Sequence, residues 1–191
     1  MSMESPSLQA RTPLYLAQPR IPSCVFEGLF VRGLEPNAPL AKALATEGYA
    51  PRCPDVDYPV QVWKRCVSQA RYLAYGELSD SEAYRILGRK LTEGFANTLL
   101  GRVAAVGLPM IGPARVVERL PRYMAMMGRP EVQVQSLSMG ERVRRVSILD
   151  IYNPPELIAG ALEVALEYAR AQPIIHVDDR SPDGFRLLVR W

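Results

Sequence analysis

The side chains that most often carry catalysis are few in this sequence and do not form a recognisable motif. It has one histidine, His176, and three cysteines, Cys24, Cys53 and Cys66. Three cysteines and a histidine can hold a structural zinc ion, but none of the spacings matches a zinc-binding motif. His176 has no cysteine or aspartate at the spacing of a nucleophile motif, so we expect it on the surface or at the edge of a sheet.

Motifs of nucleotide-binding and hydrolytic enzymes are also missing. The sequence contains no G-x-S-x-G, G-x-x-x-x-G-K or G-x-G-x-x-G stretch. The carboxylates fall on helix surfaces or in helix caps, where they form no pair suited to acid–base catalysis. We therefore predict that the protein is not an enzyme.

The positive charge is also modest. A formal charge of +3 is too small for the concentrated basic face of a nucleic-acid-binding protein, so nucleic acid is not an expected partner. Arg142, Arg144 and Arg145 form the densest basic cluster and could hold a phosphate or an acidic partner. A solvated hairpin end is the preferred interpretation of this cluster.

A long apolar helix is the best candidate for a binding element. We predict one helix over residues 79–106, beginning at the capping box Ser79-Asp80-Ser81-Glu82 and ending at Gly107 and Pro109. Apolar residues lie on two of its faces, which predicts burial on both sides. Gly94 and Gly101 indicate a close approach by another backbone or by a ligand, and helix packing is the preferred interpretation.

An apolar pocket between this helix and the sheet is the leading hypothesis for a binding site. Methionines near the change from helix to sheet are suited to an adaptable pocket, although they also fill ordinary cores. Tyr123 or Arg122 would supply a polar contact. The candidate ligand-binding residues are Leu91, Gly94, Phe95, Thr98, Arg122, Tyr123, Met124 and Met127.

The elements before the long helix are short. Residues 1–22 contain four prolines and no sustained periodicity, which predicts a flexible arm preceding a single domain over residues 23–191. The apolar run at residues 24–31 predicts a short strand or a buried lead-in. Helices are expected over residues 39–47 and from Tyr58-Pro59, where proline suits the first turn.

The second half of the chain predicts an α+β fold. A helix over residues 113–127, kinked at Pro121, precedes two strands that pair across Met139-Gly140. A helix capped by Asn153 follows, and strands at residues 174–179 and 185–191 flank a strong turn. A helical N-terminal portion is thus followed by a β-β-α-β-β antiparallel unit.

The cysteines and the hydropathy of the sequence indicate the cellular compartment. An odd number of thiols without a secretory signal favours the reducing cytoplasm. No apolar run approaches the roughly 20 residues that cross a bilayer, so we expect a soluble protein without a membrane span.

Several ordered motifs carry a resemblance that covers nearly all of residues 25–191. They are Val25-Phe26-Glu27-Gly28-Leu29-Phe30, Tyr58-Pro59 with Trp63, Ala83-Tyr84-Arg85 with Leu87-Gly88, Glu93-Gly94-Phe95, Leu120-Pro121-Arg122-Tyr123, and the closing Asp183-Gly184-Phe185 to Trp191. Together they resemble an uncharacterised family of myxobacterial paralogues, defined as a domain of unknown function. More distantly, the order of elements is similar to haem-nitric-oxide-binding (H-NOX) domains and to vinyl-reductase-type ligand-binding domains.

The resemblance to haem-binding domains implies a test for the cofactor. Those domains use an axial histidine on a helix and a Tyr-x-Ser-x-Arg stretch that holds the haem propionates. No expected helix here contains a histidine, and residues 130–150 contain no tyrosine. We therefore expect neither haem nor another cofactor.

Two functions remain open. The first is a sensor or adaptor domain in signalling that binds a small apolar ligand or a protein. The second is a homodimeric scaffold without a ligand, in which the apolar helix faces bury a partner chain.

Overall fold

The fold begins with a short strand. In the computed structural model, which describes residues 18–191, β1 (Arg20–Pro22) pairs antiparallel with β2 (Asp57–Pro59). Of the flexible arm predicted for residues 1–22, residues 1–17 lie outside the described part of the chain, and Arg20–Pro22 belong to β1.

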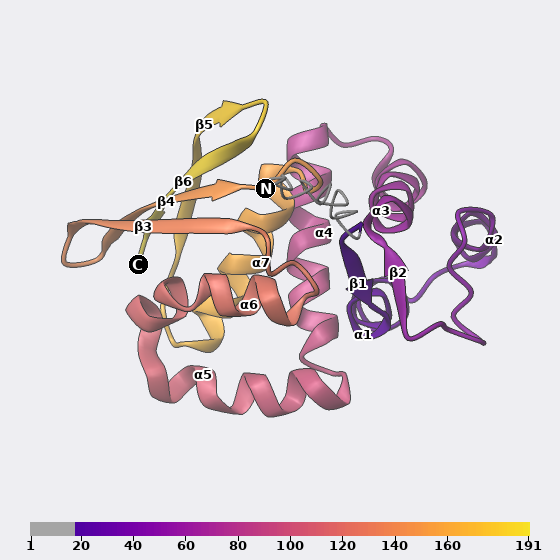
Figure 1. The fold of residues 1–191 in the computed structure, drawn as a ribbon, viewed down its shortest axis with the longest axis horizontal. Helices are drawn as coiled ribbons and strands as arrows, with labels where there is room; N and C mark the ends of the chain where they lie inside the picture. Colours follow the sequence, from indigo (N-terminus) through magenta and orange to yellow (C-terminus); the bar gives the residue numbers. More distant parts are fainter. Residues whose placement is uncertain (1–17) are drawn as a thin grey trace, which may run out of the picture.

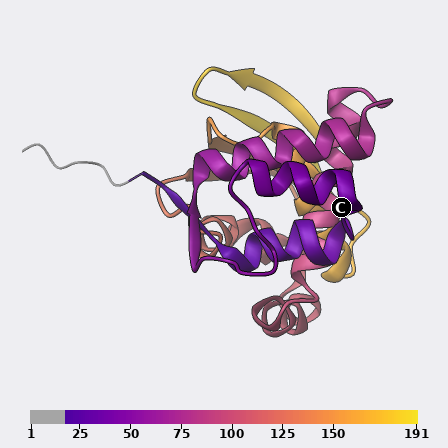
Figure 2. The same ribbon diagram turned by 90° about the vertical axis from the view of Figure 1, so that its right-hand side faces the viewer.

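The N-terminal part is helical, as predicted, and Figure 2 views the molecule from this side. Its elements are α1 (Ser23–Phe26), the π-helix η1 (Glu27–Gly33), α2 (Ala38–Thr46) and α3 (Val60–Tyr75). The apolar run at residues 24–31 is a buried lead-in but is helical, so the strand alternative is wrong. The aromatic residues of this run explain why it is helical, because Phe26 and Phe30 both pack against Tyr49 and Trp63. The ring centroids in each of these pairs lie within 5.7 Å of each other.

The predicted long helix is two helices. The capping box at Ser79 is confirmed and starts α4 (Asp80–Phe95), but α4 ends where the prediction continued. Thr98 then caps a new helix, α5 (Leu99–Glu118), by accepting a hydrogen bond from the Gly101 N–H at 3.0 Å. A Cβ at position 101 would overlap the Phe95 carbonyl oxygen, so glycine permits this tight reversal.

The helix end predicted at Gly107 and Pro109 is also wrong. α5 runs past both residues and bends sharply at Gly112, whose φ of 73° is favourable only for glycine. Pro121 does not kink a longer helix but stands in the first turn of a separate one, α6 (Leu120–Met126).

The C-terminal part is a four-stranded antiparallel sheet, which confirms the predicted α+β class. The strands β3 (Gln133–Gly140), β4 (Val143–Leu149), β5 (Ile174–Ser181) and β6 (Gly184–Arg190) follow the spatial order β3-β4-β6-β5. One helix, α7 (Pro155–Tyr168), joins β4 to β5, and its Ile158, Leu162 and Leu166 pack on the sheet. Figure 1 shows the sheet on one side, α1 to α3 on the other, and α4 between them.

The predicted cap of α7 differs in its chemistry. Its N-cap residue is Pro154, and no side chain caps the helix. Asn153 instead accepts a hydrogen bond from the Trp63 indole N–H at 2.9 Å and donates one to Asp150 at 2.7 Å. The asparagine therefore joins α3 to the start of α7 instead of closing the helix end.

Candidate ligand-binding cavity

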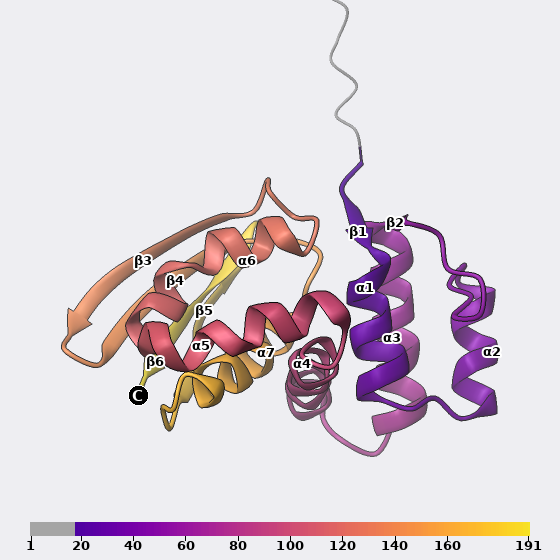
Figure 3. The same cartoon turned by 90° about the horizontal axis from the view of Figure 1, so that it is seen from below.

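An apolar cavity of about 150 Å³ lies among α4, α5, α6 and α7. Figure 3 shows α5 running beside α7, with α4 seen end-on next to them. Among the described residues, none of those lining the cavity comes from the four-stranded sheet, so this partly open site is lined mainly by helices and not by a helix and the sheet as predicted.

The cavity exists because the helices around it present small side chains. Alanines at 104 and 105 of α5 and at 161 and 165 of α7 face it, and Gly101 adds no side chain. Larger apolar side chains complete the wall. They are Ile21, Val25, Trp63, Leu91, Phe95, Leu108, Leu120, Tyr123, Met124, Met126, Met127, Leu157, Ile158, Leu162 and Tyr168.

Most of the candidate residues predicted from the sequence meet at this cavity. Leu91 and Phe95 come from α4, Tyr123 and Met124 from α6, and Met127 follows α6 directly. Segments more than 20 residues apart in the chain thus contribute to one wall.

The other three candidates lie elsewhere. Gly94 faces η1, and a Cβ there would overlap the Gly28 carbonyl oxygen, which confirms helix packing as the reason for this glycine. The Thr98 hydroxyl donates to the Phe95 carbonyl oxygen at 2.7 Å while it caps α5. Arg122 is exposed on α6.

One end of the cavity is polar, and the sequence analysis did not identify it. Arg129 and Asn153 line the cavity, and both contact the carboxylate of Asp150. Asp150 also accepts a hydrogen bond from the Tyr152 backbone N–H at 2.9 Å, and its side chain is fully buried. The only sequence signal was an isolated charge next to a predicted strand, which is common on protein surfaces.

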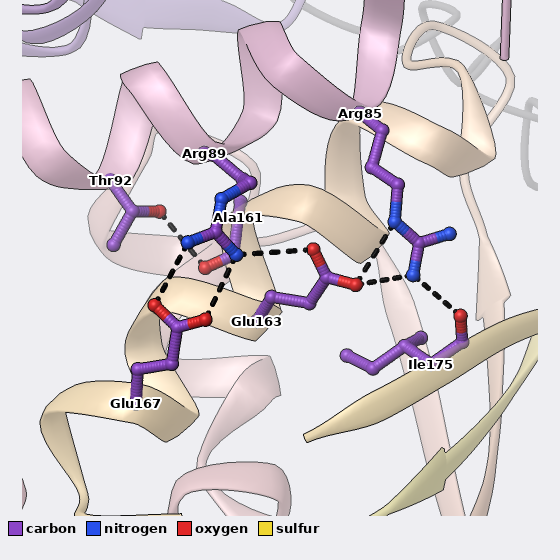
Figure 4. Close-up of polar contacts among 7 residues, drawn as sticks. All are labelled: Arg85, Arg89, Thr92, Ala161, Glu163, Glu167 and Ile175. Atoms are coloured by element: carbon purple, nitrogen blue, oxygen red, sulfur yellow. Dashed lines mark hydrogen bonds and ion pairs between the residues drawn. The ribbon is translucent and has the colours of Figure 1, made fainter. Parts of the chain in front are cut away.

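The wall made by α4 and α7 is rigidly held. The Arg85 guanidinium donates to Glu163 and, at 2.6 Å, to the Ile175 carbonyl oxygen of β5. Arg89 donates to Glu163 at 3.3 Å and to both carboxylate oxygens of Glu167 at 2.9 Å (Figure 4). Charge-assisted pairs with this two-pronged geometry are the strongest of their kind. They lock α4 against α7 and leave α5 and α6 as the less constrained walls.

The wall made by α5 has an exposed outer face, which contradicts the prediction that the helix is buried on both sides. Leu99, Val103, Val106 and Met110 are 88%, 75%, 74% and 86% exposed, respectively. Figure 1 and Figure 2 both show α5 at the outside of the molecule. By length and composition alone, α5 could also cross a membrane, although the sequence analysis expected no such segment.

The histidine and the cysteines do not form a site. His176 is exposed on the edge strand β5, as predicted, whereas Cys66 is buried in α3. Burial raises the pKa of the Cys66 thiol to about 12, so the thiol is protonated and unreactive at neutral pH. In the described part of the chain, no group of three metal-ligating side chains is positioned to hold an ion.

The basic cluster on the hairpin is partly neutralised. Arg144 lies 3.5 Å from Glu118, and Arg145 lies 3.5 Å from Asp178. Each of these two arginines therefore already has a carboxylate close to its guanidinium group.

The architecture is that of H-NOX domains. An oxygen-binding H-NOX domain related to soluble guanylate cyclases is similar with a TM-score of 0.64 and 12% identity, over 88% of this chain and 90% of that one. The H-NOX protein of S. oneidensis has the same TM-score with 14% identity, over 89% and 98% of the two chains. An H-NOX protein from K. algicida is similar with a TM-score of 0.63 and 7% identity, over 88% of this chain and 94% of that one. The TM-scores show a shared fold, and at these identities the similarity extends to the fold alone.

The chain belongs to the family described as "Protein of unknown function (DUF2378)", which matches residues 20–191. Membership of a family of unknown function, which was expected from the ordered motifs, is thereby confirmed. A search of curated proteins found no sequence that matches the chain.

A haem does not fit the residues around the cavity. Haem iron is held by histidine, cysteine or tyrosine, or by methionine together with histidine, and none of the described residues lining the cavity is a histidine or cysteine. Burial raises the pKa of Tyr123 and of Tyr168, which favours the neutral phenol over the anionic form. The volume of about 150 Å³ is that of an engineered cavity in another protein that takes up benzene, a molecule far smaller than a tetrapyrrole.

Proposed function

We propose that this chain is a non-enzymatic sensor or adaptor domain that binds a small, largely apolar molecule, without haem, in the cavity among α4, α5, α6 and α7. The single observation that carries this proposal is the cavity itself. Close-packed interiors leave few voids larger than a water molecule, whereas this one has room for an aromatic ring.

The chemistry of the wall supports an apolar ligand. Methionine side chains at 124, 126 and 127 can adjust to ligands of different shape because they are unbranched and polarizable. Binding would signal through α5, because its inner face lines the cavity and its outer face is exposed.

The first test is a comparison of the native and denatured masses of the purified protein, because a copurified ligand adds mass only to the native species. Titration with ethylbenzene, followed by calorimetry, then tests the cavity directly. Ala105→Phe should weaken binding at least about tenfold by filling the cavity. The matched control, Ala125→Phe on the exposed face of α6, should leave binding unchanged. The proposal fails if no bound mass is found and ethylbenzene shows no saturable binding.

Self-association is a second candidate function, favoured by the exposed face of α5. Its four large apolar side chains lie on one face of the helix, and exposed apolar patches mark interaction surfaces. A second copy would bury both faces in one two-fold interface. Light scattering should then give twice the monomer mass, and the double variant Val103→Glu, Val106→Glu should restore the monomer. A monomeric wild-type protein at high concentration would contradict this candidate.

A further inference from the structure

Arg129, which lines the polar end of the cavity, has one hydrogen-bond donor without an acceptor. Arg129 is 3% exposed, and its Nη1 atom is buried without a hydrogen-bond partner among residues 18–191. The rest of the guanidinium is well placed, since Nε donates to Glu131 and Nη2 donates to Asp150 at 3.1 Å. Burial of an unpaired donor destabilises the folded protein, so an acceptor at this position would remove a penalty.

Fixed contacts hold this donor in place. The Arg129 guanidinium lies over the Tyr152 ring, with its Cζ 4.9 Å from the ring centroid. Asp150 is itself held by the Tyr152 backbone N–H and the Asn153 amide. The Nη1 group therefore cannot turn toward Asp150 or Glu131 without breaking another of its interactions.

The charges around Arg129 decide which acceptor fits. Its single positive charge is already matched by Asp150, whose side chain is fully buried, and Glu131 adds a second carboxylate. With all three groups ionised, the cluster carries one net negative charge. An anionic ligand would meet this charge in a poorly solvated site, whereas a neutral acceptor would not.

The remaining polar groups decide between a carbonyl and a hydroxyl. The Asn153 side-chain oxygen is occupied by Trp63, and both oxygens of Asp150 already accept hydrogen bonds. A ligand hydroxyl would bring a donor of its own, and that donor would have to share an Asn153 or Asp150 oxygen that already accepts a hydrogen bond. A ketone, aldehyde or ester oxygen accepts without donating, and it matches the surplus donor.

On the basis of the proposed function, we infer that the ligand is an apolar molecule with one uncharged carbonyl group, whose oxygen accepts a hydrogen bond from Nη1 of Arg129. The apolar body would lie against the alanines and methionines of α5, α6 and α7. The ligand class is therefore that of apolar ketones, aldehydes and esters, and neither free acids nor plain hydrocarbons.

Three probes of similar size separate these classes in calorimetric titrations: ethylbenzene, acetophenone and benzoate. Acetophenone should bind the wild-type protein about tenfold more tightly than ethylbenzene, and benzoate at least about tenfold more weakly than acetophenone. The infrared carbonyl stretch of bound acetophenone should shift to lower frequency relative to its position in an apolar solvent. The variant Arg129→Lys keeps the positive charge beside Asp150 but lacks the planar guanidinium group. In this variant, the tighter binding of acetophenone and the infrared shift should both disappear.

The outcomes are distinguishable. If acetophenone and ethylbenzene bind the wild-type protein equally tightly, the role of Arg129 is overturned but the apolar binding site stands. If benzoate binds most tightly, the inference of an uncharged carbonyl group is overturned. Saturable binding of none of the three probes overturns the proposed function itself. If Arg129→Lys does not fold, the wild-type affinities and the infrared shift decide.

Discussion

Gly88 of α4 and Gly160 of α7 each lie against the backbone of the opposite helix. A Cβ at position 88 would overlap the Leu157 carbonyl oxygen, and one at position 160 would overlap the Arg85 carbonyl oxygen. The two glycines therefore set the distance between α4 and α7, the helices that form the rigid wall of the cavity. Any side chain at the crossing would push this wall outward.

Gly160→Ala should lower the free energy of unfolding by about 1–3 kcal/mol, because the added methyl group meets backbone that cannot move aside. Urea unfolding followed by circular dichroism measures the change. The matched control is Gly107→Ala in α5, where an added Cβ has nothing within 4 Å. It should stabilise the protein by about 0.5–1 kcal/mol through its helix propensity. Equal stability of both variants would contradict the close crossing.

Glu163→Gln should destabilise the protein more than Glu167→Gln. The Glu163 side chain is 12% exposed and bridges Arg85 and Arg89, whereas that of Glu167 is 43% exposed and pairs with Arg89. Both arginines are about one-third exposed, so solvent reduces the loss to about 1–2 kcal/mol for Glu163→Gln. For Glu167→Gln we expect no more than about 0.5 kcal/mol. Thermal unfolding of the two variants compares their stabilities, and a lower stability of Glu167→Gln would refute the prediction.

The three thiols should react with a thiol reagent at very different rates. Cys53 is exposed and should react at once at pH 8, whereas burial raises the pKa of Cys24 and raises that of Cys66 to about 12. Because the thiolate is the nucleophile, Cys66 should react only as the protein unfolds. Mass spectrometry of the labelled protein with and without urea assigns each site. Fast labelling of Cys66 in the native protein would show that the aromatic core around it is open.

Acid should weaken the start of α4. Hydrogen bonds from the Ser79 hydroxyl and backbone N–H hold the pKa of Glu82 below its usual value of 4.5. A folded-state pKa below the unfolded one gives stability above roughly pH 4.5, which is lost as pH falls through the folded value. A hydrogen bond from Arg186 lowers the pKa of Asp179, so this carboxylate also contributes stability that is lost as the pH falls.

The capping box can be separated from the other carboxylates with Ser79→Ala. The variant should be less stable than the wild-type protein at pH 6, and the difference should shrink as the pH falls through the folded-state pKa of Glu82, leaving only the loss of the hydrogen bond from the Glu82 backbone N–H to the Ser79 hydroxyl. Urea midpoints measured at pH 6 and at successively lower pH values follow this decrease. A constant difference between the two proteins would show that the ionised Glu82 carboxylate contributes nothing to the cap.

The class of fold could be predicted from the sequence because its signals are local. The Ser79 capping box, the proline after Tyr58 and the turn at Asp183-Gly184 each depend on a few neighbouring residues, and all mark true element boundaries. Alternating apolar residues predicted the strands β3 to β6, since one face of each strand must be buried. The order of these elements is enough to define a helical part followed by a β-β-α-β-β sheet unit.

The breaks within the helical region required the tertiary structure. Gly101 and Gly107 look alike in the sequence, yet the chain reverses just before the first and continues as a helix through the second. What differs is the neighbouring backbone, because a Cβ would overlap Phe95 at one position and meet nothing at the other. Such a contact depends on where distant segments lie, which no local pattern records.

The candidate site could likewise be predicted only in part from the sequence. Its apolar wall could be predicted in part, because Leu91, Phe95, Tyr123, Met124 and Met127 belong to apolar helix faces that must be buried somewhere. Its polar end could not, since Arg129 and Asp150 are separated by 21 residues and gain meaning only when the chain brings them to 3.1 Å. The sequence by itself determined the class of fold and part of the apolar wall of the site. Only the tertiary structure decided that the helices leave a cavity and that a buried arginine stands at its end, because both depend on packing between segments far apart in the chain.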